Sequence, residues 1–417
     1  MLNTMIDIGI KNRLLVVLAL LATLVGGTMI LPKLNLDAFP DVTNVQVQIN
    51  TEAQGLAAEE VEQLITFPIE AVMYALPDVE EVRSISKTGL SGITVVFKEG
   101  TDIYFARQLV FERLQVAKDD IPSGVGSPEI GPNTSGLGQV FLYMLRTTST
   151  DTDYDTIALR SLNDWVVKLL LMPVDGVTEV LSFGGEVRQY QVQINPERLL
   201  AYGLTSSDIV ESIEDNNRNA GGWYLDRYNE QLVIRGVGWI RSDEKGLSDI
   251  RNIPLKTVDG TVVRVADVAT VAFGAEIRQG AVNMTHRDAN GKPEALGEVV
   301  VGVVLKRIGS NTNATIKGIK ERLPVIQAAL PEGVIISPFY DQSELVENAV
   351  NTVTQALAIA FVLIVVVLML FLLNLRATLL VAISVPISIG LALMLMVYWE
   401  ISANLMSLGG LAIAIGM

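Results

Sequence analysis

The sequence contains no cysteine and only one histidine, His286. Disulfide bonds and thiolate metal sites are therefore excluded, and so are zinc motifs that need paired histidines. Acidic residues outnumber basic residues by 46 to 31, and the resulting net charge of −15 argues against binding to nucleic acid. Aromatic residues make up only 6% of the chain, which gives little support for an aromatic ligand cleft. Any metal site would have to use Asp, Glu, Met or His286.

Long hydrophobic stretches are abundant. Half of the 417 residues are hydrophobic and the mean hydropathy is +0.40, which indicates a membrane protein with a substantial water-exposed part. Apolar stretches of membrane-crossing length predict spans at 14–32, 346–373 and 379–399, and a fourth span begins at 403–417. Residues 1–13 mix apolar and charged side chains at helical spacing, which predicts a helix in the membrane interface.

Charged residues beside these stretches predict the orientation of the chain. Lys11 and Arg13 precede the first span and are expected to hold the N-terminus in the cytoplasm, while Arg376 lies in a short cytoplasmic turn. The polar part from Lys33 to about Glu344 would then lie outside the cytoplasm. A cleaved signal peptide is the alternative for the first stretch, but no small-residue cleavage site follows it.

The polar part alternates strand and helix patterns, which predicts an α/β fold. Within 33–135 the order is strand, helix, strand, strand and helix, as in ferredoxin-like βαβ repeats. The order recurs in 136–184 and resumes in 274–335. Residues 185–273 break the pattern and are interpreted as an inserted docking subdomain. The predicted fold class is therefore membrane α-helical plus α/β, with two extracytoplasmic repeats.

Two short motifs support an internal duplication. LPDVEEVRSIS begins at Leu76, and MPVDGVTEVLSFG begins at Met172. In each motif a helix pattern ends at a proline, an acidic turn follows, and a strand pattern of the form E-V-x-S comes next. Self-similarity of this kind indicates that one structural unit occurs twice in the chain.

Four long stretches resemble the inner-membrane pumps of the resistance-nodulation-division superfamily, and in particular its heavy-metal efflux branch. They are FPDVTNVQVQINTEAQ and its continuation (39–70), ALPDVEEVRSISKTGL and its continuation (75–110), NNRNAGGWYLDRYNEQLVIRG (216–236) and SANLMSLGGLAIAIG (402–416). The resemblance runs from end to end but covers only the N-terminal portion of pumps that are more than twice this length. It implies a proton-driven secondary transporter, and not an enzyme, in a bacterial inner membrane with a large periplasmic domain.

The resemblance also implies where protons and partners act. The proton-accepting Asp of the family would follow Met417, so no residue of this chain is expected to be catalytic. The implied partners are two further copies in a homotrimer, a periplasmic adaptor (membrane fusion) protein, an outer-membrane channel and the lipid bilayer. The implied trimer contact is a hairpin that reaches into the next protomer, with candidate residues Asn217, Ala220, Gly221, Gly222 and Trp223. From the residues alone, the alternative is that the hairpin aromatics pack within their own subdomain.

Three side chains are candidates for contact with a transported metal ion. Met406 lies in the fourth apolar stretch, where a thioether would suit a soft ion such as copper or silver. Met284 and His286 are two residues apart in a predicted strand and would face the same side. The alternatives are that Met406 is a packing residue and that the other two form an exposed polar edge. No resident cofactor is expected beyond the transported cation and protons.

One difference from the family bears on the substrate. Relatives that export zinc, cobalt or cadmium resemble D-F-G in the fourth span, where this chain has Ala414, Ile415 and Gly416. The missing carboxylate favours copper or silver over the divalent ions. Two alternatives remain open: an exporter of drugs or other organic amphiphiles, and a truncated membrane scaffold that does not transport.

Overall fold

The chain divides into two compact units, which are described separately. The computed structural model describes residues 11–30, 34–37, 39–122, 124–147, 154–258, 260–278, 280–287, 291–399 and 401–416. One unit contains the first sheet, most of the second sheet and the long apolar helices. The other contains the inserted block and the strands next to it. Residues 1–10 of the predicted interfacial helix lie outside the described residues.

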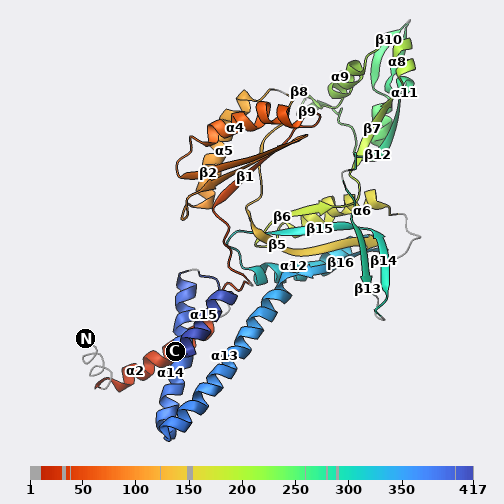
Figure 1. The fold of residues 1–417 in the computed structure, drawn as a ribbon. Helices are drawn as coiled ribbons and strands as arrows, with labels where there is room; N and C mark the ends of the chain where they lie inside the picture. Colours follow the sequence, from red (N-terminus) through yellow and green to blue (C-terminus); the bar gives the residue numbers. More distant parts are fainter. Residues whose placement is uncertain are drawn as a thin grey trace. The chain divides into compact units, whose positions relative to one another are not determined.

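The first sheet has the strand order β2-β3-β1-β4, and its described pairs are antiparallel. Successive side chains of a strand point to opposite faces, so Val47, Ile49 and Thr51 of β1 are buried while their neighbours are not. Helices α4 and α5 cover this apolar face, where Val110 and Leu114 of α5 complete the core (Figure 1). The elements are β1 (Gln46–Glu52), α3 (Ala58–Val61), η2 (Glu62–Thr66), α4 (Phe67–Met73), β2 (Val79–Lys87), β3 (Leu90–Phe97), α5 (Ile103–Asp120) and β4 (Glu129–Ile130).

The second sheet has the strand order β16-β5-β15-β6. Numbered within its own repeat, this order is fourth, first, third and second. Read from the opposite edge, it is the order of the first sheet, second, third, first and fourth. Both orders are consistent with the ferredoxin-like repeats predicted from the sequence. Strand β15 is buried along nearly its whole length, and Gly302 allows the ring of Tyr143 to pack against its backbone. The elements are β5 (Thr134–Thr147), α6 (Thr156–Leu162), η3 (Asn163–Val167), α7 (Lys168–Leu171), β6 (Val177–Phe183), β15 (Val300–Arg307), α12 (Thr312–Ala329) and β16 (Val334–Asp341).

The first helical segment of one repeat and the strand that follows it lie 98 residues from their equivalents in the other repeat. The first helical segment begins at Ala58 in one repeat and at Thr156 in the other, and it ends at Met73 and Leu171. The strand that follows begins at Val79 and at Val177. Both helical segments contain a π-helical turn, η2 or η3, in which the hydrogen-bond pattern widens by one residue. This register supports the internal duplication predicted from the two short motifs.

The inserted block contains a two-stranded sheet, a long hairpin and several short helices. Strands β7 (Arg188–Ile194) and β12 (Ala269–Ala275) pair antiparallel, and the ring of Phe273 lies 4.9 Å from that of Tyr190. The hairpin consists of β8 (Ala220–Arg227) and β9 (Glu230–Gly236). The same compact unit also contains α6 and the elements α8 (Pro196–Ala201), α9 (Ser206–Asn216), α10 (Glu244–Arg251), β10 (Pro254–Val258), β11 (Thr261–Arg264), α11 (Val265–Val268), β13 (Asn283–Arg287) and β14 (Pro293–Glu298).

Two described helices are long and apolar enough to cross a membrane, α13 (Gln342–Leu372) and α14 (Leu375–Tyr398). Their most apolar windows are 0% and 6% buried, so they are not the core helices of a soluble fold. Helices α2 (Arg13–Ile30) and α15 (Leu405–Gly416) accompany them. Gly26 gives close access to Met394 where α2 meets α14, which is how small residues let membrane helices approach.

Candidate functional site

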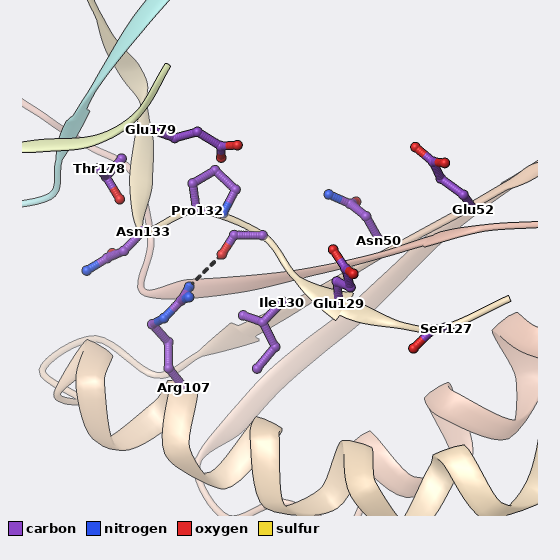
Figure 2. A pocket seen from close by; sticks show the side chains of 11 residues that line it. Asn50, Glu52, Arg107, Ser127, Glu129, Ile130, Pro132, Asn133, Thr178 and Glu179 are labelled. Carbon is purple, nitrogen blue, oxygen red and sulfur yellow. Dashed lines mark hydrogen bonds between the residues drawn. The ribbon is translucent and has the colours of Figure 1, made fainter. Parts of the chain in front are cut away.

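An acidic cavity of about 650 Å³ opens beside the first sheet and strand β6. Figure 2 shows its lining side chains on β1, α5, the stretch around β4 and the start of β6. The polar lining consists almost entirely of oxygen-bearing groups. The lining residues are Asn50, Glu52, Arg107, Ser127, Glu129, Ile130, Gly131, Pro132, Asn133, Thr178 and Glu179.

Local structure places each carboxylate of this lining. Glu52 is the last residue of β1 and Glu129 belongs to the two-residue strand β4, which pairs with β1 through Asn50. Glu179 follows the start of β6, where the side chain is about one-third exposed and lies 3.8 Å from Lys168. Three carboxylates from separate segments therefore border one cavity, which lowers its electrostatic potential and favours cations.

Arg107 is the one basic residue of the lining. Its guanidinium reaches from α5 and donates a hydrogen bond of 2.8 Å to the carbonyl oxygen of Gly131 (Figure 2). Partial burial lowers the pKa of Arg107, and interaction with Tyr104 opposes this change only in part. Arginine stays charged at any physiological pH, and Lys168 pairs with Glu179, so two positive charges accompany the three carboxylates and the cavity keeps only a small net negative charge.

The cavity is not a finished metal centre in the described part of the chain. No group of three or more His, Asp or Glu side chains there is close enough to hold an ion. A cavity of this size with separated carboxylates suits a hydrated or partly hydrated cation, because such an ion keeps most of its water ligands. The arrangement can therefore attract and pass a cation more readily than trap it.

The three metal candidates from the sequence lie outside this cavity. Met406 lies in the first turn of α15 and is 73% exposed, and its N–H donates to the side-chain oxygen of Asn404. Met284 and His286 lie on β13, where His286 is the direct cross-strand neighbour of Glu294 on β14. The His286 Nε2 and a carboxylate oxygen of Glu294 are 3.5 Å apart. Met406 belongs to a different compact unit from the β13 pair.

The predicted trimer hairpin is present as β8 and β9. Ala220, Gly221, Gly222 and Trp223 all lie on β8, where every residue is exposed and Trp223 reaches 82%. A Cβ atom on Gly222 would lie 2.4 Å from the carbonyl oxygen of Ile234, so glycine permits the close approach of β8 to β9. Within the described chain, the hairpin aromatics are therefore not buried by their own subdomain.

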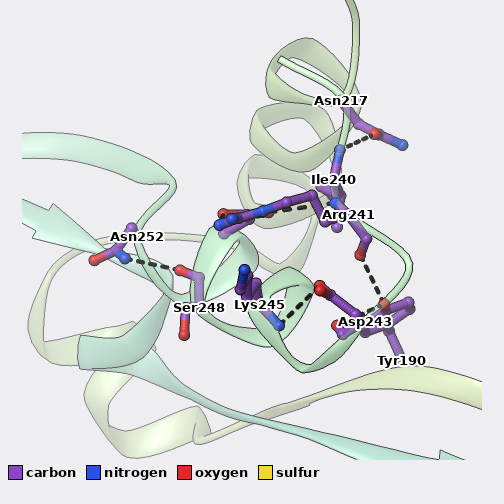
Figure 3. A network of polar contacts seen from close by, with 9 residues as sticks. Tyr190, Asn217, Ile240, Arg241, Asp243, Lys245, Ser248 and Asn252 are labelled. Carbon is purple, nitrogen blue, oxygen red and sulfur yellow. Dashed lines mark hydrogen bonds and ion pairs between the residues drawn. The ribbon is translucent and has the colours of Figure 1, made fainter. Parts of the chain in front are cut away.

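Asn217 anchors the base of this hairpin instead of lining its tip. Its side-chain oxygen accepts a hydrogen bond of 3.0 Å from the N–H of Ile240 (Figure 3). Arg241 continues the base with a two-bond ion pair to Asp249, which lowers the pKa of Asp249. The hydroxyl of Tyr190 donates to the carbonyl oxygen of Arg241 at 2.8 Å. Sequence reasoning assigned Asn217 to the hairpin but missed this anchoring role.

Sequence reasoning also missed the carboxylates of the cavity. Glu179 was visible as part of the repeated E-V-x-S motif, whose first-repeat equivalent is Glu81. The two positions differ in surroundings, since the Glu81 side chain is 56% exposed and lies 3.6 Å from Arg83. No local pattern distinguishes them, because the cavity depends on where distant strands meet.

Comparison with known proteins places these features in a family. The model of the AcrB/AcrD/AcrF family matches residues 5–417. The cation efflux system protein CzcA of Alcaligenes sp. (strain CT14) is 43% identical over 99% of this chain, which spans 38% of that relative. The cation efflux system protein CusA of Escherichia coli (strain K12) is 36% identical over the whole chain, again 38% of its own length.

A solved structure agrees with the sequence relatives. The crystal structure of a heavy metal efflux pump superimposes with a TM-score of 0.83 at 33% identity, covering 98% of this chain and 39% of that one. The fold of this chain is therefore found within a chain of much greater length. The relatives named above are two cation efflux system proteins and a heavy metal efflux pump. This chain belongs to the AcrB/AcrD/AcrF family of resistance-nodulation-division efflux transporters.

Proposed function

We propose that the chain is the N-terminal part of an inner-membrane pump that exports heavy-metal cations in exchange for protons. The observation that carries this proposal is the acidic cavity bordered by Glu52, Glu129 and Glu179. Two ferredoxin-like repeats contribute its walls, and a change in their separation would open or close it, as alternating access requires. The family relatives supply the export direction and the class of substrate.

The experiment removes the carboxylates without changing their size. Glu52→Gln, Glu129→Gln and Glu179→Gln are introduced together, and growth of the source bacterium is measured against zinc, cobalt, cadmium, copper and silver. We expect at least about a tenfold loss of tolerance to the exported ion, since three charges that attract it disappear. Glu81→Gln is the matched control, because it changes the equivalent residue of the first repeat outside the cavity. Equal tolerance in the triple variant and the wild type would rule out the cavity as part of the path.

The ion class follows from the donor atoms. The polar lining offers carboxylate, amide and hydroxyl oxygen with no thioether or imidazole, which favours divalent ions over copper(I) or silver(I). Copper or silver remains the second candidate, because Ala414, Ile415 and Gly416 stand where exporters of divalent ions carry a carboxylate. Hypersensitivity of a deletion strain to zinc, cobalt or cadmium supports the first, and hypersensitivity to silver or copper supports the second.

The same strain separates the remaining alternatives. Drug sensitivity with unchanged metal tolerance would indicate an exporter of organic amphiphiles, and no phenotype would indicate a scaffold. Helices α13 and α14, with α2 and α15, are proposed to be spans of a multi-pass inner-membrane protein whose two sheets lie in the periplasm. The predicted boundaries at 33–135, at 136–184 with 274–335, and at 185–273 remain our proposal for two porter subdomains and a docking subdomain.

The exposed hairpin supports a homotrimer in which β8 and β9 contact the next protomer. Trp223 and Tyr224 pack edge to face on one strand and present apolar surface to a partner. Residues 185–273 are proposed to dock to an outer-membrane channel and to a periplasmic adaptor protein. Because the chain has no cysteine, a photoreactive cross-linker attached to Trp223→Cys reacts from this site alone, and failure to trap any dimer or trimer would contradict the assembly.

A further inference from the structure

The short stretch that follows α2 is fastened to the membrane side of its unit. Leu36 bridges Ala403 in the loop between α14 and α15, and the N–H of Ala403 donates a 2.8 Å hydrogen bond to Asn35. Leu34 is only 5% exposed and packs with Met396. Residues 34–37 therefore follow any displacement of the apolar helices.

The same stretch is linked to the second sheet by a buried polar relay. The Lys306 ammonium, at the end of β15, donates to the Thr312 hydroxyl at 2.9 Å. That hydroxyl donates in turn to a carboxylate oxygen of Asp37 at 2.5 Å. The ammonium and the same oxygen are 3.6 Å apart, and the side chains of Lys306 and Asp37 are only 10% and 22% exposed. A charged pair shielded to this degree is screened little by water or salt.

The charge of Lys306 also reaches a second carboxylate. Burial alone would raise the pKa of Asp41, but hydrogen bonds from Thr43 and Ser135 outweigh it, and the Lys306 charge adds to their effect. The net result is a lowered pKa, so Asp41 stays ionised beside the relay. The carbonyl oxygen of Lys306 accepts a 2.9 Å hydrogen bond from Thr134 at the start of β5. Lys306 thus joins two neighbouring strands of the second sheet to the membrane-side stretch.

A second ion pair connects α12, the helix that carries Thr312, to the apolar helix α13. Lys320 on α12 pairs with Asp341, which caps the N-terminus of α13, and also donates to Ser343 at 3.2 Å. Val346, one turn further into α13, is fully buried. Two connections therefore run from the apolar helices to the second sheet, and each contains a lysine–carboxylate contact. The connection through residues 34–37 uses Lys306 of β15 and Asp37, and the connection through α13 uses Lys320 of α12 and Asp341.

We propose that Lys306 is a positioning residue that couples movement of the membrane helices to the second sheet through Thr312 and Asp37. The Lys320–Asp341 pair supplies a parallel and more exposed connection. The proposal rests on the proposed function, because coupling between membrane and periplasmic parts has a purpose only in a transporter. Its physical basis is that a short relay with shielded charges resists extension.

The absence of cysteine allows a direct test. Met29→Cys on α2 and Val325→Cys on α12 replace exposed side chains, 71% and 50% exposed, and accept two spin labels without background. The distance between the labels is measured by pulsed electron paramagnetic resonance on the whole chain in lipid nanodiscs. We expect one narrow distance in the otherwise native chain and in Lys306→Arg, and loss of that single distance in Lys306→Met.

Two controls separate coupling from stability. Lys306→Met alone leaves the largely buried Asp37 charge without its partner, which would lower stability. It is therefore compared with the triple variant Lys306→Met, Thr312→Val and Asp37→Leu, which removes the whole relay. Apolar replacement of a whole buried ion pair is often tolerated, so we expect an unfolding midpoint close to wild type but the same loss of the narrow distance. Lys317→Met, at an exposed site on α12, should change neither. A triple variant that keeps the narrow distance would overturn the proposal.

Cation tolerance is measured in parallel with the same variants. A deletion strain with unchanged metal tolerance would end the proposed function, yet the label distances would still decide whether the relay fixes α2 to α12. If the wild type is functional and the triple variant keeps both the narrow distance and full tolerance, the coupling role of the relay is disproved and the proposed function stands. In the coupled case, tolerance and the narrow distance are lost together.

Discussion

The two repeats build the same turn with different residues. The residue before the second strand has a positive φ in both, 58° at Asp78 and 84° at Gly176, and the two positions are equivalent in the duplication. In each repeat the carbonyl oxygen of this residue accepts a hydrogen bond, from Lys98 at 2.9 Å or from Arg307 at 2.8 Å. The backbone of the turn is therefore fixed, while the side chain at this position is free to differ with its surroundings.

The surroundings explain the difference. A Cβ atom on Gly176 would lie 2.0 Å from the hydroxyl of Thr315 on α12. At Asp78 the side chain instead extends into solvent, 61% exposed, and lies 3.6 Å from the ammonium of Lys98. In the second repeat α12 packs directly against the turn. The same helix contacts Asp37 through Thr312 and Asp341 through Lys320. Duplicated units can thus keep a backbone while one copy becomes more tightly constrained.

Exchange of the turn residues should have the largest effect in the tight copy. Gly176→Ala places a side chain at positive φ and against Thr315, and these penalties together cost about 2–5 kcal/mol. The midpoint of thermal unfolding, followed by circular dichroism in detergent, should fall by several degrees. Gly55→Ala is the control, because Gly55 also has positive φ but no atom within 4 Å of the added methyl. Equal losses in the two variants would show that only the backbone angle matters.

A substitution in the π-helical turn of the first repeat should have an intermediate effect on the free energy of unfolding. The Thr66 hydroxyl lies 2.8 Å from both Ser86 and Ser91 and 3.3 Å from the carbonyl oxygen of Val61, five residues earlier. Thr66→Val leaves buried hydroxyls without a partner and should cost about 1–3 kcal/mol.

Hydrogen exchange of the segment 62–66 tests whether this loss is local. We expect faster exchange there than in the second repeat, whose η3 turn does not use Thr66. Thr101→Val is the control, since its hydroxyl bond to Lys98 is exposed and should matter little. Unchanged exchange in Thr66→Val would mean that packing alone holds the π turn.

Acid should weaken the second repeat through Asp341. Burial alone would raise the pKa of this carboxyl, but hydrogen bonds from Lys320 and Ser343 and the charge of Lys320 outweigh it and lower the pKa. A carboxyl with a lowered folded pKa stabilises the fold above its unfolded pKa of about 3.9, and that contribution is lost as pH falls through the folded value. Because Lys320 is half exposed, the contribution is at most about 1 kcal/mol.

The measurement compares unfolding midpoints at pH 6 and pH 3 for wild type, Lys320→Met and Lys98→Met. Lys320→Met should reduce the acid-dependent loss. Lys98→Met, which removes the fully solvated ion pair of the first repeat, should leave it unchanged. An identical pH response in all three proteins would assign the acid sensitivity to other carboxyl groups.

Local patterns were sufficient to predict much of the fold. Alternating residues predicted β1, apolar length predicted α13 and α14, and the E-V-x-S motif predicted two equivalent strands. The helix pattern of residues 58–73 contains a π-helical turn that ends at Thr66, and Pro68 sits acceptably in the first turn of α4 that follows. A break in a helix pattern is visible in sequence, but the kind of hydrogen bonding that replaces it is not.

Long-range contacts could not be predicted from the same patterns. Thr312 and Asp37 are 275 positions apart, and neither carries a local signal that points to the other. Glu52, Glu129 and Glu179 meet at one cavity only because β4 returns to β1 and the second repeat supplies β6. Glu81 obeys the same motif as Glu179 but remains outside the cavity. Equivalent residues in a duplication therefore acquire different surroundings from the packing of the two copies, and not from their own sequence.

The smallest expected effect is in the loose copy of the turn. Asp78→Gly removes the strain of a side chain at positive φ but loses the exposed contact to Lys98 and adds flexibility to the unfolded chain. These terms nearly cancel, so the free energy of unfolding should change by less than about 0.5 kcal/mol, since Asp tolerates this conformation better than most residues. Denaturant unfolding of Asp78→Gly beside Gly176→Ala measures the asymmetry directly. If Asp78→Gly also cost several kcal/mol, the Asp78 side chain would have to hold the turn itself, and the difference between the repeats would lie in the turn and not in the helix packed on it.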